Sequence, residues 1–339
     1  MDCVFLSYED ISDTATVREH VDAVRSAYRQ RGNGAPTVPR TSLQNDDPAG
    51  LLNSYIAILP ETGVMGGYTY SAGFGDEDAW LMTPLFDVES GRPLALLDGA
   101  ALNTYKTGAA GAVGIDALAR KDSRVLSVFG SGAQAYGQAL AAVETRPFDE
   151  LLVYSPTWEH RESFAATMER RAGIEASAVE SPAEATVPAD VIVTATTAST
   201  PVFDADDLQP GTHINAVGQY DPEKRELPAQ VIRDSIYVPD LRERALQDAG
   251  SFLLARDEGF VDNDHIHGEL GDVIAGTVPG RTGRDEITVF DSGGTALETV
   301  ASAALTYEKA VEDGRGIELP FVPASEGYEG KKGSTAEEL

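Results

Sequence analysis

The fold of this chain is decided by one stretch, Val125-Leu126-Ser127-Val128-Phe129-Gly130-Ser131-Gly132-Ala133-Gln134-Ala135. A mostly apolar run leads into Gly130-x-Gly132-x-x-Ala135, and a helix-forming run follows at 139–143. The order strand, glycine turn, helix is typical of dinucleotide-binding folds, where alanine is tolerated in the last position. Gly130 would permit the tight turn, and Gly132 would let a pyrophosphate approach the amino end of the helix. An ordinary strand–helix turn is the alternative, and the flanking elements favour the dinucleotide site.

The α/β pattern continues after this stretch. A helix is expected near residues 159–171 and a closing helix at 295–311. Further apolar runs predict strands at residues 151–154, 191–196, 213–218, 236–238 and 287–290. Because short apolar strands alternate with helices, they predict a largely parallel, doubly wound sheet.

The part of the chain before residue 103 has a different pattern. Apolar residues at helical spacing predict a helix over 11–31, after which a Gly/Pro-rich stretch leads in extended form to Arg40. Strand-like runs at 54–59, 68–70, 81–88 and 93–97, the last two joined by a turn at 89–92, predict an antiparallel sheet. Residues 103–114 are almost all small, so this helix can approach another backbone or a ligand closely.

Composition narrows the class of protein. With 339 residues, of which 42% are hydrophobic, the chain is long enough for two domains. Its 55 acidic and 26 basic residues give a net charge of −29. Such a surface repels nucleic acid phosphates and anionic membranes, so neither is an expected partner. It suits a protein kept soluble at high salt, and we infer a halophilic source.

The cysteine count and the N-terminus bear on the compartment. Cys3 is the single cysteine, which excludes an internal disulfide or a cysteine-built metal site. The N-terminus has no basic-then-apolar signal pattern, and no apolar run has the length of a membrane span. We therefore expect a soluble, cytoplasmic protein.

The glycine turn is one of seven short motifs along the chain that together indicate a family. They lie at residues 38–40, 87–95, 103–110, 129–135, 210–218, 225–227 and 288–294. In this order they resemble the ornithine cyclodeaminase/mu-crystallin family, which includes archaeal-type alanine dehydrogenases and ketimine reductases. The resemblance implies an α/β homodimer in which a Rossmann doubly wound parallel sheet (116–299) is inserted in a sheet-rich α+β dimerisation domain (1–115 with 300–325). Residues 326–339 are expected to form a loose tail.

The resemblance also implies which residues bind the substrate. Arg40 occupies the position of the substrate-carboxylate arginine, and Lys106 stands where the family has an arginine, so it could hold a carboxylate or a phosphate as a point charge. Met65 falls where the family carries a substrate-contacting lysine. Tyr220 takes the position of a family acid, with Asp221 one residue later. Asp221 is either a general acid or base or an ordinary turn aspartate. These departures count against ornithine cyclodeamination.

The cofactor preference depends on the end of the second Rossmann strand. Ser155 stands where an NAD site usually has an acid, and Thr157, His160 and Arg161 could receive a 2′-phosphate, so NADP is favoured over NAD. His265 and His267 lack a third ligand, and no metal site is expected. The full set of expected cofactor-binding residues is Gly130, Ser131, Gly132, Ala133, Gln134, Ser155, Thr157, Arg161, Thr196, Asn215, Ala216, Val217, Gly218 and Ser292.

Together these features predict an NAD(P)-dependent oxidoreductase. It would transfer a hydride between the nicotinamide and the C=N or C–NH2 carbon of a small imino or amino carboxylate, with Arg40, Lys106 and Asp221 as the catalytic residues. Ketimine reduction is the leading hypothesis, ahead of alanine dehydrogenase-like and ornithine cyclodeaminase-like activity. In a different class, the chain would be a nicotinamide-cofactor or small-ligand binding protein with little turnover.

Overall fold

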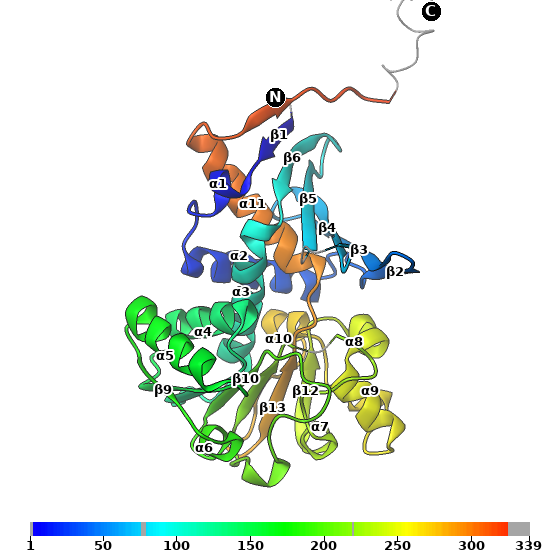
Figure 1. Ribbon diagram of the computed structural model, residues 1–339. Coiled ribbons are helices and arrows are strands. Elements are labelled where there is room, and N and C mark those ends of the chain that lie inside the picture. The colour runs from blue at the N-terminus through cyan, green and yellow to red at the C-terminus, as the bar shows by residue number, and fades with distance from the viewer. Residues whose placement is uncertain (1–2, 76–78, 219, 325–339) are drawn as a thin grey trace, which may run out of the picture.

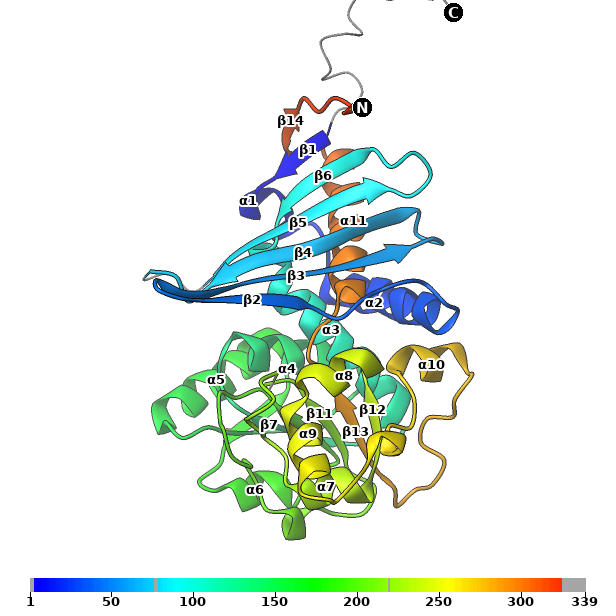
Figure 2. The same cartoon turned by 90° about the vertical axis from the view of Figure 1, so that its right-hand side faces the viewer.

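The computed structural model describes residues 3–75, 79–218 and 220–324 (Figure 1). Two seven-stranded sheets lie one above the other, with helices between them (Figure 2). The expected tail, residues 326–339, lies outside the described residues. Within the described part, no helix combines the length and the apolar character that a bilayer span requires.

The first sheet, here called the mixed sheet, has the strand order β14-β1-β6-β5-β4-β3-β2. Its strands are β1 (Cys3–Leu6), β2 (Thr41–Asp46), β3 (Ala49–Leu59), β4 (Val64–Ala72), β5 (Ala79–Asp87), β6 (Pro93–Asp98) and β14 (Ile317–Leu319). The predicted antiparallel pairing is confirmed for β3 to β6. The sheet is not purely antiparallel, because β1 pairs with β6 in parallel. β1, β2 and β14 were not predicted.

Four helices line one face of the mixed sheet: α1 (Tyr8–Ile11), α2 (Val17–Gly32), α3 (Ala100–Leu118) and α11 (Ala296–Glu312) (Figure 2). The single helix predicted over 11–31 is wrong in its start. Ser7 and Thr16 each form a capping box, with Asp10 and Glu19 respectively, so the chain makes two helices with a break between them.

The second sheet, the parallel sheet, has the order β12-β13-β11-β10-β7-β8-β9. All its pairings are parallel, which confirms the predicted doubly wound sheet of Rossmann type. Its strands are β7 (Val125–Phe129), β8 (Glu150–Tyr154), β9 (Glu175–Ala178), β10 (Val191–Thr194), β11 (His213–Ala216), β12 (Ser235–Pro239) and β13 (Ile287–Asp291). Strand order reverses between β7 and β10, and ligands of such folds bind at this switch point.

The helices that accompany the parallel sheet are α4 (Ala133–Thr145), α5 (Trp158–Ala172), α6 (Pro182–Thr186), α7 (Ala229–Asp234), α8 (Arg242–Asp248), α9 (Gly250–Asp257) and α10 (Leu270–Ala275). Helix α3 joins the two sheets and packs tightly on α4. A Cβ on Gly108 would lie 2.3 Å from the Gly137 carbonyl oxygen, so only small residues allow this approach. The predicted role of the small-residue run is confirmed.

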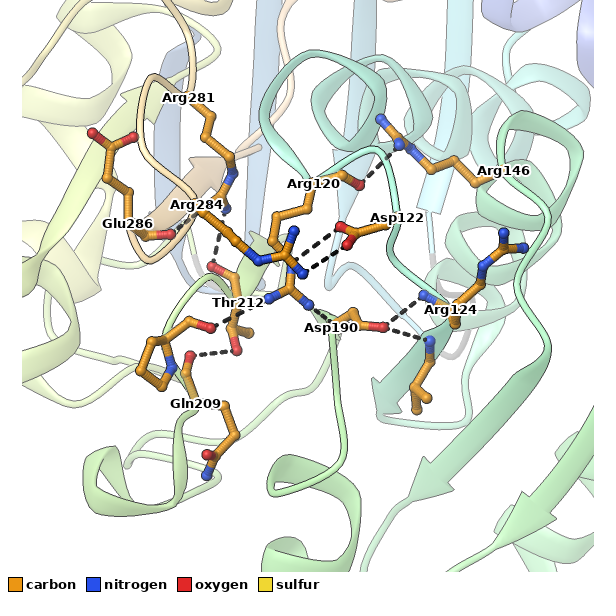
Figure 3. A network of polar contacts seen from close by, with 12 residues as sticks. Arg120, Asp122, Arg124, Arg146, Asp190, Gln209, Thr212, Arg281, Arg284 and Glu286 are labelled. Atoms are coloured by element: carbon orange, nitrogen blue, oxygen red, sulfur yellow. Dashed lines mark hydrogen bonds and ion pairs between the residues drawn. The ribbon is translucent and has the colours of Figure 1, made fainter.

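Arginines gather at the amino ends of the parallel strands (Figure 3). Arg281 Nε donates to the Leu118 carbonyl at 2.8 Å, and Arg146 Nη2 donates to the Ile115 carbonyl at 3.2 Å, so both cap the last turns of α3. Asp190 pairs with Arg120 and accepts from the Val125 N–H at 3.0 Å. We call Arg120, Arg124, Arg146, Asp190, Arg281 and Arg284 the amino-edge network. It fixes α3 to the sheet at the edge opposite the glycine turn.

Candidate functional site

The glycine turn after β7 has the geometry that its sequence predicts. Gly130 has a φ of +111°, and a Cβ there would lie 2.3 Å from the Ala195 carbonyl oxygen, so the position requires glycine. Gly132 is the N-cap of α4 without a side-chain hydrogen bond. A Cβ on Gly132 would meet no atom within 4 Å. The amino end of α4, which begins at Ala133, is therefore open to an anionic ligand.

A cavity of about 330 Å³ lies beside this turn, at the switch point between β7 and β10. Gly130, Tyr154, Ser155 and Thr196 line it, from the carboxyl ends of three strands. The Gln134 Oε1 atom is buried nearby on α4 and makes no hydrogen bond within the described structure. These features fit a dinucleotide, with the pyrophosphate at the start of α4.

The residues expected at the cofactor ribose have two different environments. Ser155 Oγ accepts from Ser131 Oγ at 3.2 Å and donates to the Thr157 carbonyl at 3.3 Å, so these residues shape the end of β8. Arg161 instead stacks between aromatic rings and donates to the Val179 carbonyl. His160 lines a second small cavity beside Ser131 and Gly132. Of the two basic side chains expected to bind a 2′-phosphate, His160 is thus the one beside the turn.

The loops after β10 and β11 are held together by Glu226, whose role was not predicted. Its buried carboxylate accepts from the Thr196 N–H at 2.7 Å, the Thr194 hydroxyl at 2.8 Å and the Gly218 N–H at 3.0 Å. Burial raises the pKa of Glu226, while these hydrogen bonds oppose the rise. The carboxylate therefore positions two loops at the carboxyl ends of the parallel strands, which we call the cofactor edge because the glycine turn lies there.

The remaining expected cofactor residues lie at the carboxyl ends of β11 and β13. The Ser292 N–H donates to the Ala216 carbonyl at 2.8 Å, and the Ser292 hydroxyl is buried without a partner in the described structure. Val217 continues from Ala216 and donates its N–H to the Thr194 carbonyl. The Asn215 amide points away from this edge and donates to the Gly111 carbonyl of α3 at 2.9 Å. Asn215 therefore links α3 to the parallel sheet through its side chain.

Arg40 points into the junction between the two sheets. It precedes β2 and is 7% exposed. Its Nε lies 3.1 Å from Asp248 Oδ2, its Nη2 donates to the Gly293 carbonyl, and its guanidinium carbon lies 4.7 Å from the centre of the Tyr220 ring. A buried guanidinium thus lies directly beside the loop after β13, at the same sheet edge as the glycine turn.

Arg244, on α8, extends this arrangement and was not predicted. It is fully buried, with its Nε 2.8 Å from Asp240 Oδ1 and its Nη2 2.6 Å from Asp291 Oδ1. Its Nη1 lies 3.4 Å from Asp248, which connects it to Arg40. Burial raises the pKa of Asp240 and of Asp248, and Arg244 opposes both shifts. We call Arg40, Asp240, Arg244, Asp248 and Asp291 the junction network.

Lys106, on α3, is the second cation at the junction. It is 2% exposed, and its Nζ donates to the Thr107 hydroxyl at 3.3 Å and lies 5.0 Å from the centre of the Tyr68 ring. Burial lowers the pKa of Lys106, and the charge of Glu298 opposes that shift. Lys106 and Arg40 thus contact neighbouring rings, Tyr68 and Tyr55.

Met65 lies away from the junction between the two sheets. Met65 pairs with Ile58 and Phe86, and all three line a groove on the outer face of the mixed sheet. Alternate residues of a strand face opposite sides, so the inner residue three places later, Tyr68, is the one beside Lys106. The two glycines at 66 and 67 hide the alternation in the sequence.

Asp221 lies in a turn. Its carboxylate accepts from the Glu223 N–H at 3.0 Å and lies 3.1 Å from Lys224 Nζ. The hydrogen bond from Glu223 and the charge of Lys224 hold the pKa of Asp221 below its usual value. The neighbour that contacts Arg40 is Tyr220, so the geometry favours the turn interpretation of Asp221.

The two histidines near residue 266 do not form a metal site with their neighbours. His265 Nε2 lies 2.6 Å from the Ile232 carbonyl oxygen, and His267 Nε2 lies 2.8 Å from that of Pro279. No cluster of three or more metal-ligating side chains occurs within residues 3–75, 79–218 and 220–324.

Comparisons with known proteins agree with this architecture. The model of the ornithine cyclodeaminase/mu-crystallin family matches residues 1–314. A Delta(1)-pyrroline-2-carboxylate reductase of Bacillus cereus is 37% identical over 78% of this chain and 79% of its own. The Thermococcus litoralis Delta(1)-pyrroline-2-carboxylate reductase, solved with NADH and L-proline, is 34% identical over 93% of this chain and 100% of that chain, with a TM-score of 0.88. An archaeal alanine dehydrogenase dimer with bound NAD is 32% identical over 95% and 100%, with a TM-score of 0.88. The chain belongs to the ornithine cyclodeaminase/mu-crystallin family.

Proposed function

We propose that the chain is an NAD(P)H-dependent oxidoreductase that reduces the C=N bond of a small cyclic 2-imino carboxylate. The observation that carries this proposal is the place of Arg40, a buried guanidinium beside Gly293 at the cofactor edge of the parallel sheet. A guanidinium binds a carboxylate bidentately. The similarity to pyrroline-2-carboxylate reductases supports the same chemical class.

The substrate would lie beside Arg40, next to the loop after β13. A bound reduced nicotinamide would supply the hydride at this position. Tyr68 lies beside Tyr55 and Tyr70, with ring centres 5.4 and 5.6 Å apart, and the Arg40 guanidinium is 6.0 Å from the Tyr55 ring. This aromatic wall suits an apolar ring and keeps water from the imine. Arg40 holds the carboxylate and orients the imine carbon.

A substrate panel tests the proposal. The purified protein would be incubated with NADPH or NADH and, in turn, Δ1-pyrroline-2-carboxylate, Δ1-piperideine-2-carboxylate, and pyruvate with ammonia. We expect loss of the reduced-nicotinamide absorbance with the cyclic imines. Loss with pyruvate and ammonia alone would instead identify an alanine dehydrogenase-like enzyme, and deamination of L-ornithine a cyclodeaminase. Cofactor binding without turnover of any compound would identify a binding protein.

For the cofactor we propose NADP in preference to NAD. Ser155 leaves the end of β8 without a carboxylate to repel a 2′-phosphate, and His160 lines the cavity beside Ser131 and Gly132. We expect a lower KM for NADPH than for NADH, and a His160→Ala variant that raises the KM for NADPH alone. Equal KM values for the two cofactors in the unmodified protein would contradict this preference.

For the assembly we propose a homodimer that covers the outer face of the mixed sheet, with residues 1–115 and 300–325 as the dimerisation domain. Exposed apolar side chains occupy this face: Leu43, Leu52, Ile56, Trp80 and Met82. An apolar surface of this kind marks a protein interface. The similarity to an archaeal dimer supports the arrangement. Light scattering should give twice the chain mass, and Ile56→Asp should give the monomer mass.

A further inference from the structure

Lys106 is an ammonium buried without a carboxylate partner. The ion pairs of the described residues include Arg40 with Asp248, at 3.1 Å, but none that involves Lys106. The hydrogen bond from its Nζ goes to a neutral hydroxyl, that of Thr107. A buried charge without a counter-ion destabilises a fold. Such a group beside a ligand site is a candidate for chemistry.

The acids around Lys106 are engaged elsewhere. Glu298 accepts from the Thr295 N–H at 2.7 Å and from the Thr295 hydroxyl, so it caps α11. Asp240 is bound to Arg244 and to the Gly294 N–H at 2.8 Å.

Three charges act on Lys106 from different elements. Glu298 and Asp240 raise its pKa, while Arg40 and, more strongly, burial lower it. The ring of Tyr68, on β4, also faces the Lys106 ammonium, with its centre 5.0 Å from Nζ. The ammonium can therefore lose a proton more readily than a lysine at the surface.

We propose that Lys106 is the proton donor of the reaction, a role that rests on the proposed function. As the imine carbon accepts a hydride from the reduced nicotinamide, the C=N electron pair moves onto nitrogen. A new N–H bond forms there while an Nζ–H bond of Lys106 breaks. After the product has left the site, the neutral amine of Lys106 takes a proton from water that enters. In the direction of amine oxidation, neutral Lys106 accepts the proton.

The other charged groups of the junction are less suited to this role. Arg40 and Arg244 are guanidiniums, which stay protonated. Asp248 is held between Arg40 and Arg244. Asp221 is bound in its turn to Lys224. The remaining competing role for Lys106 is a second clamp for the substrate carboxylate, and an arginine could perform that role equally well.

Lys106→Arg separates the two roles, because it keeps the positive charge and removes the titratable proton. We expect kcat for imine reduction to fall about 100-fold or more, with KM and the dissociation constant for NADPH within about threefold of the unmodified protein. Lys121→Arg, at an exposed lysine after α3, is the matched control and should change neither. A Lys106→Arg variant with at least half of the original kcat would overturn the proposal. If the unmodified protein reduces no imine, the proposed function has failed instead.

A second readout does not depend on turnover. The chain has six lysines, so NMR of protein labelled at lysine Cε gives a spectrum that can be resolved. The Lys106 signal is the one missing in Lys106→Arg, and in the unmodified protein it is also the one least broadened by a soluble paramagnetic agent. We expect it to titrate at lower pH than the exposed lysines. A signal that titrates together with theirs would overturn the proposal even if Lys106→Arg does not fold.

Discussion

The parallel sheet carries an arginine network at each end of its strands, and the two differ in what they hold in place. In the amino-edge network, Arg146 and Arg281 donate to main-chain carbonyls of α3, and Arg120 pairs with Asp190. In the junction network, Arg40 and Arg244 are held by carboxylates, and Lys106 lies nearby without one. Carbonyl-bound arginines hold a helix in place, whereas Arg40, at the cofactor edge, can exchange its partner for a ligand. We therefore expect stability to depend on the first network and catalysis on the second.

Arg40→Met should have the largest effect. It removes the bidentate carboxylate site, and we expect kcat/KM for a cyclic imino carboxylate to fall about 100- to 1000-fold. The matched control is Arg124→Met, whose side chain is half exposed at the amino edge. Steady-state kinetics of both variants would be measured beside cofactor binding. A similar loss in both variants would remove the functional distinction between the two networks.

Arg281→Met should lower stability without a loss of catalysis. The change removes the Arg281 hydrogen bonds to the Leu118 and Glu286 carbonyls and leaves Leu118 with only the longer bond from the Thr288 hydroxyl, at 3.2 Å. We expect a cost of about 3 kcal/mol in the free energy of unfolding. Urea denaturation would measure this cost, and kcat/KM should remain within about twofold. An active-site defect at unchanged stability would reverse the assignment of this network.

Asp248→Asn tests how the junction network holds Arg40. The variant weakens the contact with Arg40 Nε and leaves the cation itself, so we expect KM for the substrate to rise about tenfold with kcat within about threefold. Asp248 is thus a positioning residue. Asp257→Asn, at an exposed pair with Arg256, is the control. An unchanged KM in Asp248→Asn would mean that Gly293 and Tyr220 orient Arg40 without Asp248.

His213 should make the amino edge sensitive to acid. It is buried, and its Nδ1 lies 2.9 Å from Thr288 Oγ1, which also accepts from Arg281. Burial lowers the pKa of His213 from 6.5 to about 3, so the unfolded chain binds a proton that the folded chain does not. Stability contributed by neutral His213 is present above pH 6.5 and is lost as the pH falls toward 3. We expect a loss of about 1.4 kcal/mol between pH 7.5 and 5.5, absent in His213→Gln, from urea denaturation at each pH. Equal losses in both proteins would contradict this assignment.

The elements that could be predicted from sequence are those whose signals are local. The β7 turn combines an apolar run, two glycines and a helix-forming segment, and each points to the same structure. The break between α1 and α2 depends on two capping boxes within an otherwise helical pattern. The short strands β1 and β14 are fixed by their pairing partners, which lie far away in the chain.

The same limit applies to the site. The motif at residues 38–40 drew attention to Arg40, whereas no local pattern connects Arg244 with Asp291, which lies 47 residues further along the chain. The i,i+4 spacing of Asp240, Arg244 and Asp248, just before and on α8, is visible in the sequence and is equally typical of an exposed helix. Met65 and Tyr68 could not be assigned to faces because glycines separate them. The junction network could therefore be recognised only in the structure, where its charged side chains are seen to be buried together.

The most direct test of this account is a crystal structure of the protein with NADP⁺ and L-proline. We expect the pyrophosphate to lie on the amide groups at Gly132 and Ala133, and the proline carboxylate to bind Arg40 with its ring beside Tyr68. A dinucleotide absent from the glycine turn, or a carboxylate bound away from Arg40, would contradict the central claim that the two sheets form one site at their junction.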